Sequence, residues 1–152
     1  MTESSLRGDE LIASRRIAAP VERVWESLTT PHHLAQFWGG DHAYIPEDSI
    51  TVDLRVGGTC EMESQALDTR TPGNRLVFRY EQVQGPDLLV FVEPTTGLET
   101  TIRLTADGPQ TEITIHQRRL PPELRTGQAR EGLVGLLNAL AEHVKHHIEG
   151  HR

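Results

Sequence analysis

Residues 15–39 read RRIAAPVERVWESLTTPHHLAQFWG, and this stretch decides the fold. A segment that ends at Pro20 is followed by apolar residues at helical spacing, which predicts a short amphipathic helix with proline in its first turn. These apolar residues are Val21, Val24, Trp25 and Leu28. Thr30 and Pro31 then start a second short helix, which carries Phe37 and Trp38 to a glycine stop at Gly39. The order is therefore strand, helix, helix.

From residue 49 onward the apolar residues recur with a period of two, which predicts antiparallel strands. The turn signals between them are Gly57 with Gly58, Gly85 with Pro86, and Asp107 with Gly108. We expect strands near residues 10–18, 49–55, 60–63, 76–82, 88–93, 98–105 and 110–117. Residues 39–48 are expected to form a mobile loop.

The hairpin turns also predict registers. Pairing Val83 with Leu88 and Ala106 with Pro109 turns the large side chains of four strands to one face. These registers place Tyr80 opposite Phe91, Phe78 opposite Glu93, Ile102 opposite Ile113 and Thr100 opposite Ile115.

The chain closes with a long helix that carries one apolar stripe. The stripe consists of Leu133, Leu136, Leu137, Leu140, Val144 and Ile148. Gly132 and Gly135 lie next to the stripe and each cost about 1 kcal/mol of helix propensity relative to alanine, which suggests that another segment approaches closely or that side-chain bulk was removed. The helix must lie across the sheet.

These residues together resemble the SRPBCC (START-like) superfamily, and within it the homologues of the activator of heat-shock protein 90 ATPase. The resemblance covers nearly the whole chain. It rests on Ala19–Pro20, Val24–Trp25, Thr30–Pro31, Phe37–Trp38–Gly39, Gly57–Gly58, the strand at residues 75–78 and the leucines of the last helix. One departure is Leu133, which follows Gly132 where the family usually has tryptophan.

The resemblance implies an α+β helix-grip fold, as in START-like and Bet v-like proteins. A curved antiparallel sheet of about seven strands would wrap around the C-terminal helix, with two short helices between the first two strands. At 152 residues and 36% hydrophobic composition, the chain has room for one core. We expect a flexible tail at residues 1–8, one domain at 9–149 and a short tail at 150–152.

Composition excludes several function classes. The formal charge of -7 offers no basic surface for nucleic acid. No apolar run approaches the roughly 20 residues of a membrane span, and the polar residues 1–10 lack the apolar segment that a signal peptide contains. The single cysteine, Cys60, fits a reducing compartment, and we expect a cytoplasmic protein without cofactor or metal.

The inward faces of the strands and the last helix predict an apolar cavity for a small molecule. The predicted lining is Trp38, Met62, Phe78, Tyr80, Leu89, Phe91, Glu93, Thr100, Ile102, Ile113, Ile115, Leu133, Leu136 and Leu137. The alternative is that the same side chains pack on the helix and leave no space. Glu93 either anchors a cationic or hydroxylated ligand, acts as an acid or base, or lies solvated at the rim.

Catalytic and metal chemistry have weaker signals. His143, His147 and His151 are spaced i, i+4, i+8 with His146 beside them, which fits either a metal site or a solvated helix end. His32, His33 and His42 lie near the cavity mouth or on ordinary surface. Cys60 is expected to be a buried structural thiol, because no basic residue stands near it in sequence.

Three functions remain open. The first is binding of a small hydrophobic or aromatic molecule. The second, implied by the resemblance, is a co-chaperone-like interaction domain with a role in stress response. The third is a polyketide cyclase- or dehydratase-like enzyme, with Tyr80, Glu93 and His116 as candidates although His116 is expected to face outward. No complete catalytic set is visible, so binding is favoured; a homodimer is compatible with each.

Overall fold

The computed structural model describes residues 2–40, 43–67 and 73–150, with side chains through residue 145. The strands are β1 (Glu3–Arg7), β2 (Glu10–Ile17), β3 (Ala43–Tyr44), β4 (Thr51–Val52), β5 (Thr59–Ala66), β6 (Asn74–Gln84), β7 (Leu88–Val92), β8 (Glu99–Asp107) and β9 (Gln110–Arg118). The α-helices are α1 (Val21–Thr29), α2 (Pro31–Phe37) and α3 (Gly127–Gly150), and η1 (Glu47–Ser49) and η2 (Pro122–Leu124) are short 3₁₀ turns.

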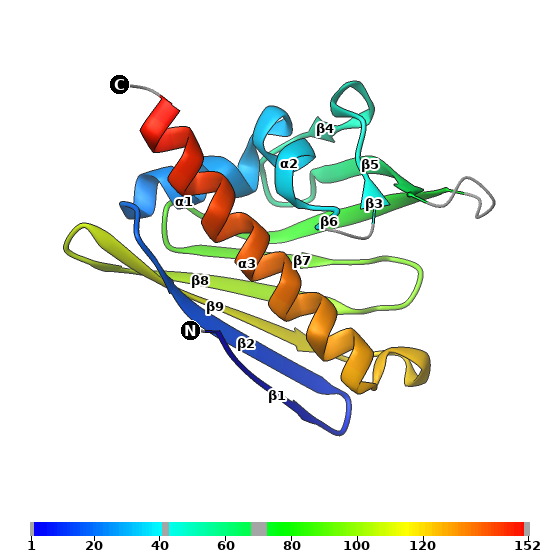
Figure 1. Ribbon diagram of the computed structural model, residues 1–152. Coiled ribbons are helices and arrows are strands. Elements are labelled where there is room, and N and C mark those ends of the chain that lie inside the picture. Colours follow the sequence, from blue (N-terminus) through cyan, green and yellow to red (C-terminus); the bar gives the residue numbers. More distant parts are fainter. Residues whose placement is uncertain (1, 41–42, 68–72, 151–152) are drawn as a thin grey trace.

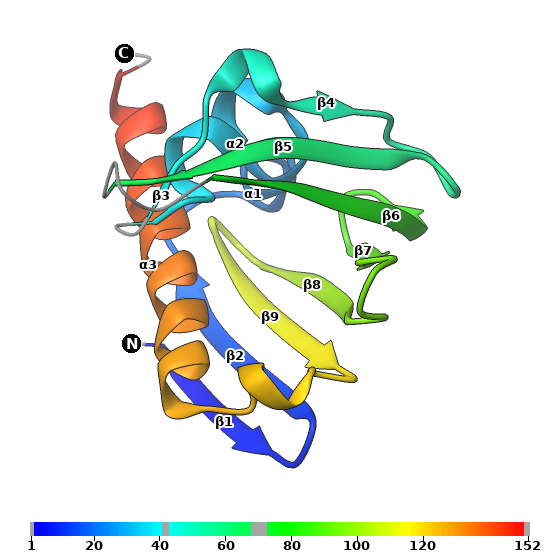
Figure 2. The ribbon, with the colours of Figure 1, turned by 90° about the vertical axis from the view of Figure 1, so that its right-hand side faces the viewer.

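The described strands form one curved antiparallel sheet. Its order is β1-β2-β9-β8-β7-β6-β5-β3, with β4 paired to β5. The long helix α3 lies across the concave side of this sheet, and α1 and α2 pack near its C-terminal end (Figures 1 and 2). The α+β helix-grip fold is confirmed, with a strand count slightly above the predicted one.

The strand β1 was not foreseen. Residues expected to belong to a flexible tail pair with β2, from Glu3 opposite Ser14 to Arg7 opposite Glu10. A strand at the sheet edge tolerates the polar residues of this segment, because one face points to water. The apolar residue Leu6 packs against the core. The proposed domain limits themselves stay a prediction.

The predicted β8–β9 register is wrong; in the β6–β7 hairpin the predicted pairing of Val83 with Leu88 is wrong and that of Tyr80 with Phe91 is confirmed. In the β8–β9 hairpin Ile102 lies opposite Ile115, two residues from the predicted partner. The turn is Gly108–Pro109 with a positive φ at Gly108, because proline cannot donate to the ladder but suits the second turn position. A shift of two residues keeps every side chain on its face.

The β6–β7 hairpin contains a bulge. Val83 pairs with Leu89 rather than Leu88, and an irregularity between Tyr80 and Gln82 then restores the predicted pairing of Tyr80 with Phe91. A bulge inserts one extra residue in one strand and so changes the pairing by one position.

Two further expectations change. The predicted loop at residues 39–48 contains β3 and most of η1, while His42 lies outside the described residues. At Gly132 and Gly135 an added Cβ would meet nothing within 4 Å. These glycines therefore mark no close approach, because they lie on the exposed side of α3.

The helix α3 lies closest to the sheet edge that contains β1 and β2. Its main neighbours are β1, β2, α1 and α2. The Asn138 side chain accepts a hydrogen bond of 2.6 Å from the Thr2 hydroxyl and one of 2.8 Å from Arg15. Among the described residues, no helix has the length and apolar character that crossing a membrane requires.

Candidate functional site

A cleft of about 200 Å³ lies between α3, Trp38 and the concave faces of β6 to β9. Its lining consists of Trp38, Leu76, Phe78, Phe91, Glu93, Leu98, Thr100, Ile102, Ile115, Gln117, Leu133 and Leu136. An apolar cavity of roughly 150 Å³ is enough to hold benzene. The cleft therefore has room for a molecule built on a single aromatic ring.

Three aromatic rings form one wall of the cleft. The Phe78 and Phe91 rings are tilted with centroids 5.0 Å apart, and the Trp38 ring stands edge-on to Phe78 at 5.9 Å. Trp38 and Phe91 are 6.3 Å apart. These separations are typical of stabilising aromatic pairs. The end of α2 therefore places Trp38 against rings from two strands.

Polar side chains occur at one end of the cleft. Phe91 pairs with Thr100, and Thr100 pairs with Gln117, so these three residues form one row across the concave face. Glu93 lies two residues after Phe91, so its side chain is on the same face of the sheet and also lines the cleft. The Glu93 main chain is fixed: its N–H donates to Leu98 O at 2.9 Å, and its carbonyl accepts from Gly97 N–H at 2.8 Å.

Behind the aromatic wall the interior is almost filled. A second cavity of about 20 Å³, enough for about one water molecule, lies toward α1 and α2. Its lining combines Trp38, Phe78, Phe91 and Ile102 of the cleft with Leu28, Leu34, Cys60, Met62, Tyr80 and Leu89. The space between sheet and helix is thus filled at one end and open at the other.

The predicted lining residues divide into three groups in the structure. Trp38, Phe78, Phe91, Glu93, Thr100, Ile102, Ile115, Leu133 and Leu136 line the cleft. Met62, Tyr80 and Leu89 line only the small inner cavity. Ile113 and Leu137 border neither cavity and are fully buried in the core.

The prediction missed Leu76, Leu98 and Gln117. The alternation of side chains along a strand could have found them, because residues two apart lie on the same face. Leu76 is two residues from Phe78, Leu98 two from Thr100, and Gln117 two from Ile115. They were omitted because they lie at or beyond the ends of the expected apolar rows.

The Cys60 thiol is free and buried, as predicted. Burial raises its pKa from 9.0 to about 11, although a hydrogen bond with the Tyr80 side chain opposes this effect. Burial, followed by the neighbouring thiol, also holds the pKa of Tyr80 well above its usual range. Both groups are therefore neutral at physiological pH, and neither is a ready nucleophile or base.

The three candidate catalytic residues do not come together. Tyr80 lies in the inner cavity and Glu93 in the cleft. His116 is on the opposite face of the sheet, where its Nε2 is 2.7 Å from the Glu10 carboxylate.

His33 is buried rather than superficial. Its Nδ1 lies 2.9 Å from His143 Nε2, and its Nε2 lies 3.7 Å from Glu26 Oε1. The pair joins α2 to α3, and Phe37 stacks on His143 at 5.9 Å. His32 is exposed and contacts Glu47 at 2.9 Å.

Among the described side chains, no group of three His, Cys, Asp or Glu residues is arranged to hold a metal ion. The predicted metal ridge on α3 extends beyond these side chains. The side chains of His146 and His147 and all of His151 lie outside the part of the chain that the structure describes.

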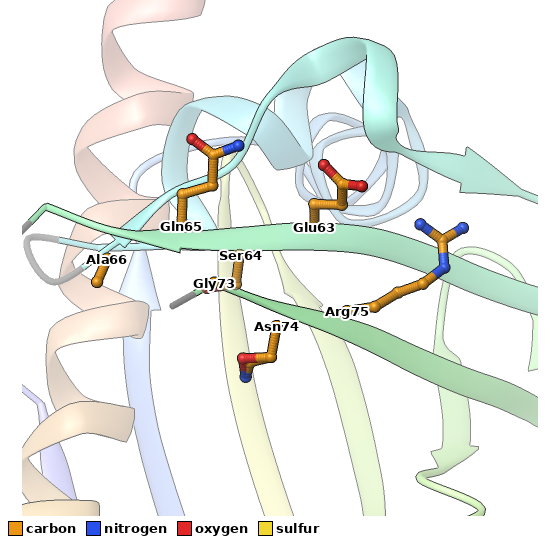
Figure 3. Close-up of a pocket in the computed structure, with 7 residues that line it drawn as sticks. All are labelled: Glu63, Ser64, Gln65, Ala66, Gly73, Asn74 and Arg75. Carbon is orange, nitrogen blue, oxygen red and sulfur yellow. The ribbon is translucent and has the colours of Figure 1, made fainter. Parts of the chain in front are cut away.

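A larger hollow of about 510 Å³ lies at the end of the β5–β6 hairpin (Figure 3). It is an open, polar surface in which Glu63 and Arg75 are cross-strand neighbours. Arg75 pairs with Glu61 at 3.0 Å. This hollow lacks the apolar enclosure of the cleft, so it is the weaker ligand site.

Fold and cleft together define the class: a helix-grip domain with a partly open space between sheet and C-terminal helix. The family described as Activator of Hsp90 ATPase homolog 1-like protein matches residues 18–145, and the chain belongs to this family. The family and the fold support, in general terms, a ligand-binding or co-chaperone-like domain.

Solved structures show the same fold at low sequence identity. A protein from Rhodobacter sphaeroides is 17% identical with a TM-score of 0.81, over 99% of each chain. A protein from Nitrosomonas europaea is 21% identical with a TM-score of 0.79, over 92% of this chain and 96% of that one. An AHSA1-like protein from Aeromonas hydrophila is 22% identical with a TM-score of 0.73, over 88% and 92%. No curated protein matches the chain.

Proposed function

We propose that this protein binds a small aromatic molecule in the cleft between α3 and the strands β6 to β9. The observation that carries the proposal is the joint lining of a 200 Å³ space by Trp38, Phe78 and Phe91 with three polar groups at one end. Small-molecule sites commonly combine an apolar wall with a few polar groups that fix orientation.

The test is NMR titration of the labelled protein with one-ring aromatic compounds and with aliphatic compounds of matched size. Binding in the cleft shifts the Trp38 indole signal and the backbone amides of Thr100 and Leu133. The side-chain methyl of Thr101, which lines the hollow on the other face of the sheet, is the internal reference. Absence of shifts for every compound, or shifts confined to the outer face, would refute the proposal.

A matched pair of variants locates the site. Thr100 is 6% exposed and lies in the cleft, whereas its neighbour Thr101 lies on the outer face. Thr100→Leu is expected to weaken aromatic binding at least tenfold by occupying the space. Thr101→Leu is expected to leave affinity unchanged, and equal effects of both would contradict the assignment.

A second proposal rests on the family, whose description refers to activation of a chaperone ATPase. We propose that the chain contacts a chaperone of the heat-shock protein 90 type. The check is the chaperone's ATP hydrolysis rate with and without the purified protein, and an unchanged rate together with no complex by gel filtration would remove this function.

A cytoplasmic location, supported by the free Cys60 thiol, and a homodimer stay predictions.

A further inference from the structure

The cleft contains one charged side chain, the carboxylate of Glu93. Its other polar members, Thr100 and Gln117, are neutral, and no lysine, arginine or histidine belongs to the described lining. A carboxylate group on a ligand would therefore approach a like charge and would find no cation to pair with. A protonated amine would meet its opposite charge.

The Glu93 side chain is available for such a contact. Among the described residues, its carboxylate has no hydrogen bond or ion pair. The cation on the adjacent turn, Arg119, donates to Gly97 O at 2.9 Å and lies 3.7 Å from Glu99, so its positive charge is already engaged. The main-chain hydrogen bonds of Glu93 hold the residue in place, and the residue is half-buried.

The aromatic wall favours the same ligand charge. The faces of tryptophan and phenylalanine rings carry negative potential and attract cations within about 6 Å. Trp38, Phe78 and Phe91 lie within 6.3 Å of one another and line the same cleft as Glu93, so their ring faces add to the negative potential of the carboxylate. The formal charge of the chain, -7, also raises the local concentration of cations.

We infer that the cleft selects aromatic molecules that carry a protonated amine and rejects aromatic carboxylates, with Glu93 as the residue that determines this specificity. The inference rests on the proposed function, because it concerns the same cleft. The aromatic ring occupies the wall of Trp38, Phe78 and Phe91, and the ammonium group donates hydrogen bonds to the Glu93 carboxylate.

The experiment uses three ligands of similar size, each with one phenyl ring and one polar end group: 2-phenylethylamine, 2-phenylethanol and phenylacetate. Affinities are measured by NMR titration at neutral pH and low salt, where the amine and the acid are fully charged. We expect the amine to bind at least tenfold more tightly than phenylacetate, with the alcohol between them. Raising the salt concentration is expected to reduce this difference.

The variant Glu93→Gln keeps the shape of the side chain and removes its charge. It is expected to abolish the advantage of the amine, strengthen phenylacetate binding and leave 2-phenylethanol unchanged. The control is Glu112→Gln, which removes the same charge from the outer face of β9, where Glu112 lies 3.8 Å from Arg16. This control is expected to keep the wild-type order of affinities.

The outcomes separate the two proposals. If the alcohol binds but the amine shows no advantage over phenylacetate, or if the advantage survives in Glu93→Gln, the inference is overturned and the aromatic-binding function stands. If none of the three ligands shifts the cleft signals, both fail. Unchanged thermal unfolding of Glu93→Gln confirms that a lost preference reflects charge rather than misfolding.

Discussion

Replacing Leu133 by tryptophan measures whether the cleft is empty space. Leu133 projects from α3 into the cleft lining and is 6% exposed, so the larger side chain must extend into the 200 Å³ volume. A closed cavity of this size would cost about 5 kcal/mol at roughly 24 cal/mol per Å³. The cleft is open at one end, and an indole fills only part of it, so we expect a smaller gain of about 1 kcal/mol, within the range for cavity-filling substitutions.

Leu137→Trp is the matched control. Leu137 lies one helical turn further along α3, is fully buried and borders neither cavity. Overpacking such a site costs about 1–3 kcal/mol or more. The two variants therefore carry the same chemical change on the same helix but are expected to shift stability in opposite directions.

The assay is urea unfolding followed by circular dichroism, with ligand titration of each folded variant. Leu133→Trp should unfold at the wild-type urea concentration or above it and should lose aromatic binding by tenfold or more. If Leu133→Trp destabilises the fold as strongly as Leu137→Trp, the space is not available and the reasoning about the cleft is wrong.

Four further substitutions test the exposed side of α3, the packing on Trp25 and the electrostatics of the buried thiol. Gly135→Ala and Gly132→Ala are each expected to stabilise the protein by up to about 1 kcal/mol in calorimetry, because a Cβ there meets nothing within 4 Å; a loss of stability would contradict the exposed placement. Gly85→Ala is expected to cost at least about 1 kcal/mol, since its Cβ would lie 2.8 Å from two ring atoms of Trp25, and unchanged stability would show that the ring moves aside freely. The pKa of the Cys60 thiol is about 11 in the folded state against 9.0 in the unfolded chain, so the unfolded state loses its proton first. The free energy of unfolding is therefore expected to fall by about 2 kcal/mol as pH rises from 9 to 11. In Cys60→Ala this alkaline decline should be shallower, and an identical pH profile would refute the coupling.

The parity of side chains could be predicted from sequence, whereas their exact partners could not. Alternation alone placed Phe78, Phe91 and Thr100 on the concave face, and the structure agrees. The pairing of residues across the β8–β9 hairpin depends on which two residues make the turn. Moving the turn by one residue, from Asp107–Gly108 to Gly108–Pro109, shifts every cross-strand partner by two residues. The choice of Gly108–Pro109 changes Ile102's partner without changing its face.

Contacts between distant segments were the least predictable. In the sequence, His33 lies in the first turn of a short helix, which favours an exposed position. It is buried because α2 packs against His143 of α3. Likewise, Ile113 and Leu137 have the same local pattern as the cleft residues. Only the position of α3 over the sheet decides which inward side chains touch the helix and which border open space.

The position of α3 follows from the strand that sequence patterns did not reveal. With β1 added to the sheet edge, Leu6 packs against the core, and Asn138 gains hydrogen bonds from Thr2 and Arg15 on that side. These contacts hold α3 over β1 and β2, while α1 and α2 fill the interior near its C-terminal end. Within the described part of the chain, the strands β6 to β9 are not among the main neighbours of α3, and the cleft lies between them and the helix, at Phe91, Thr100 and Gln117. The cleft therefore lies where α3, held at the sheet edge by these polar contacts, leaves space above the strands β6 to β9.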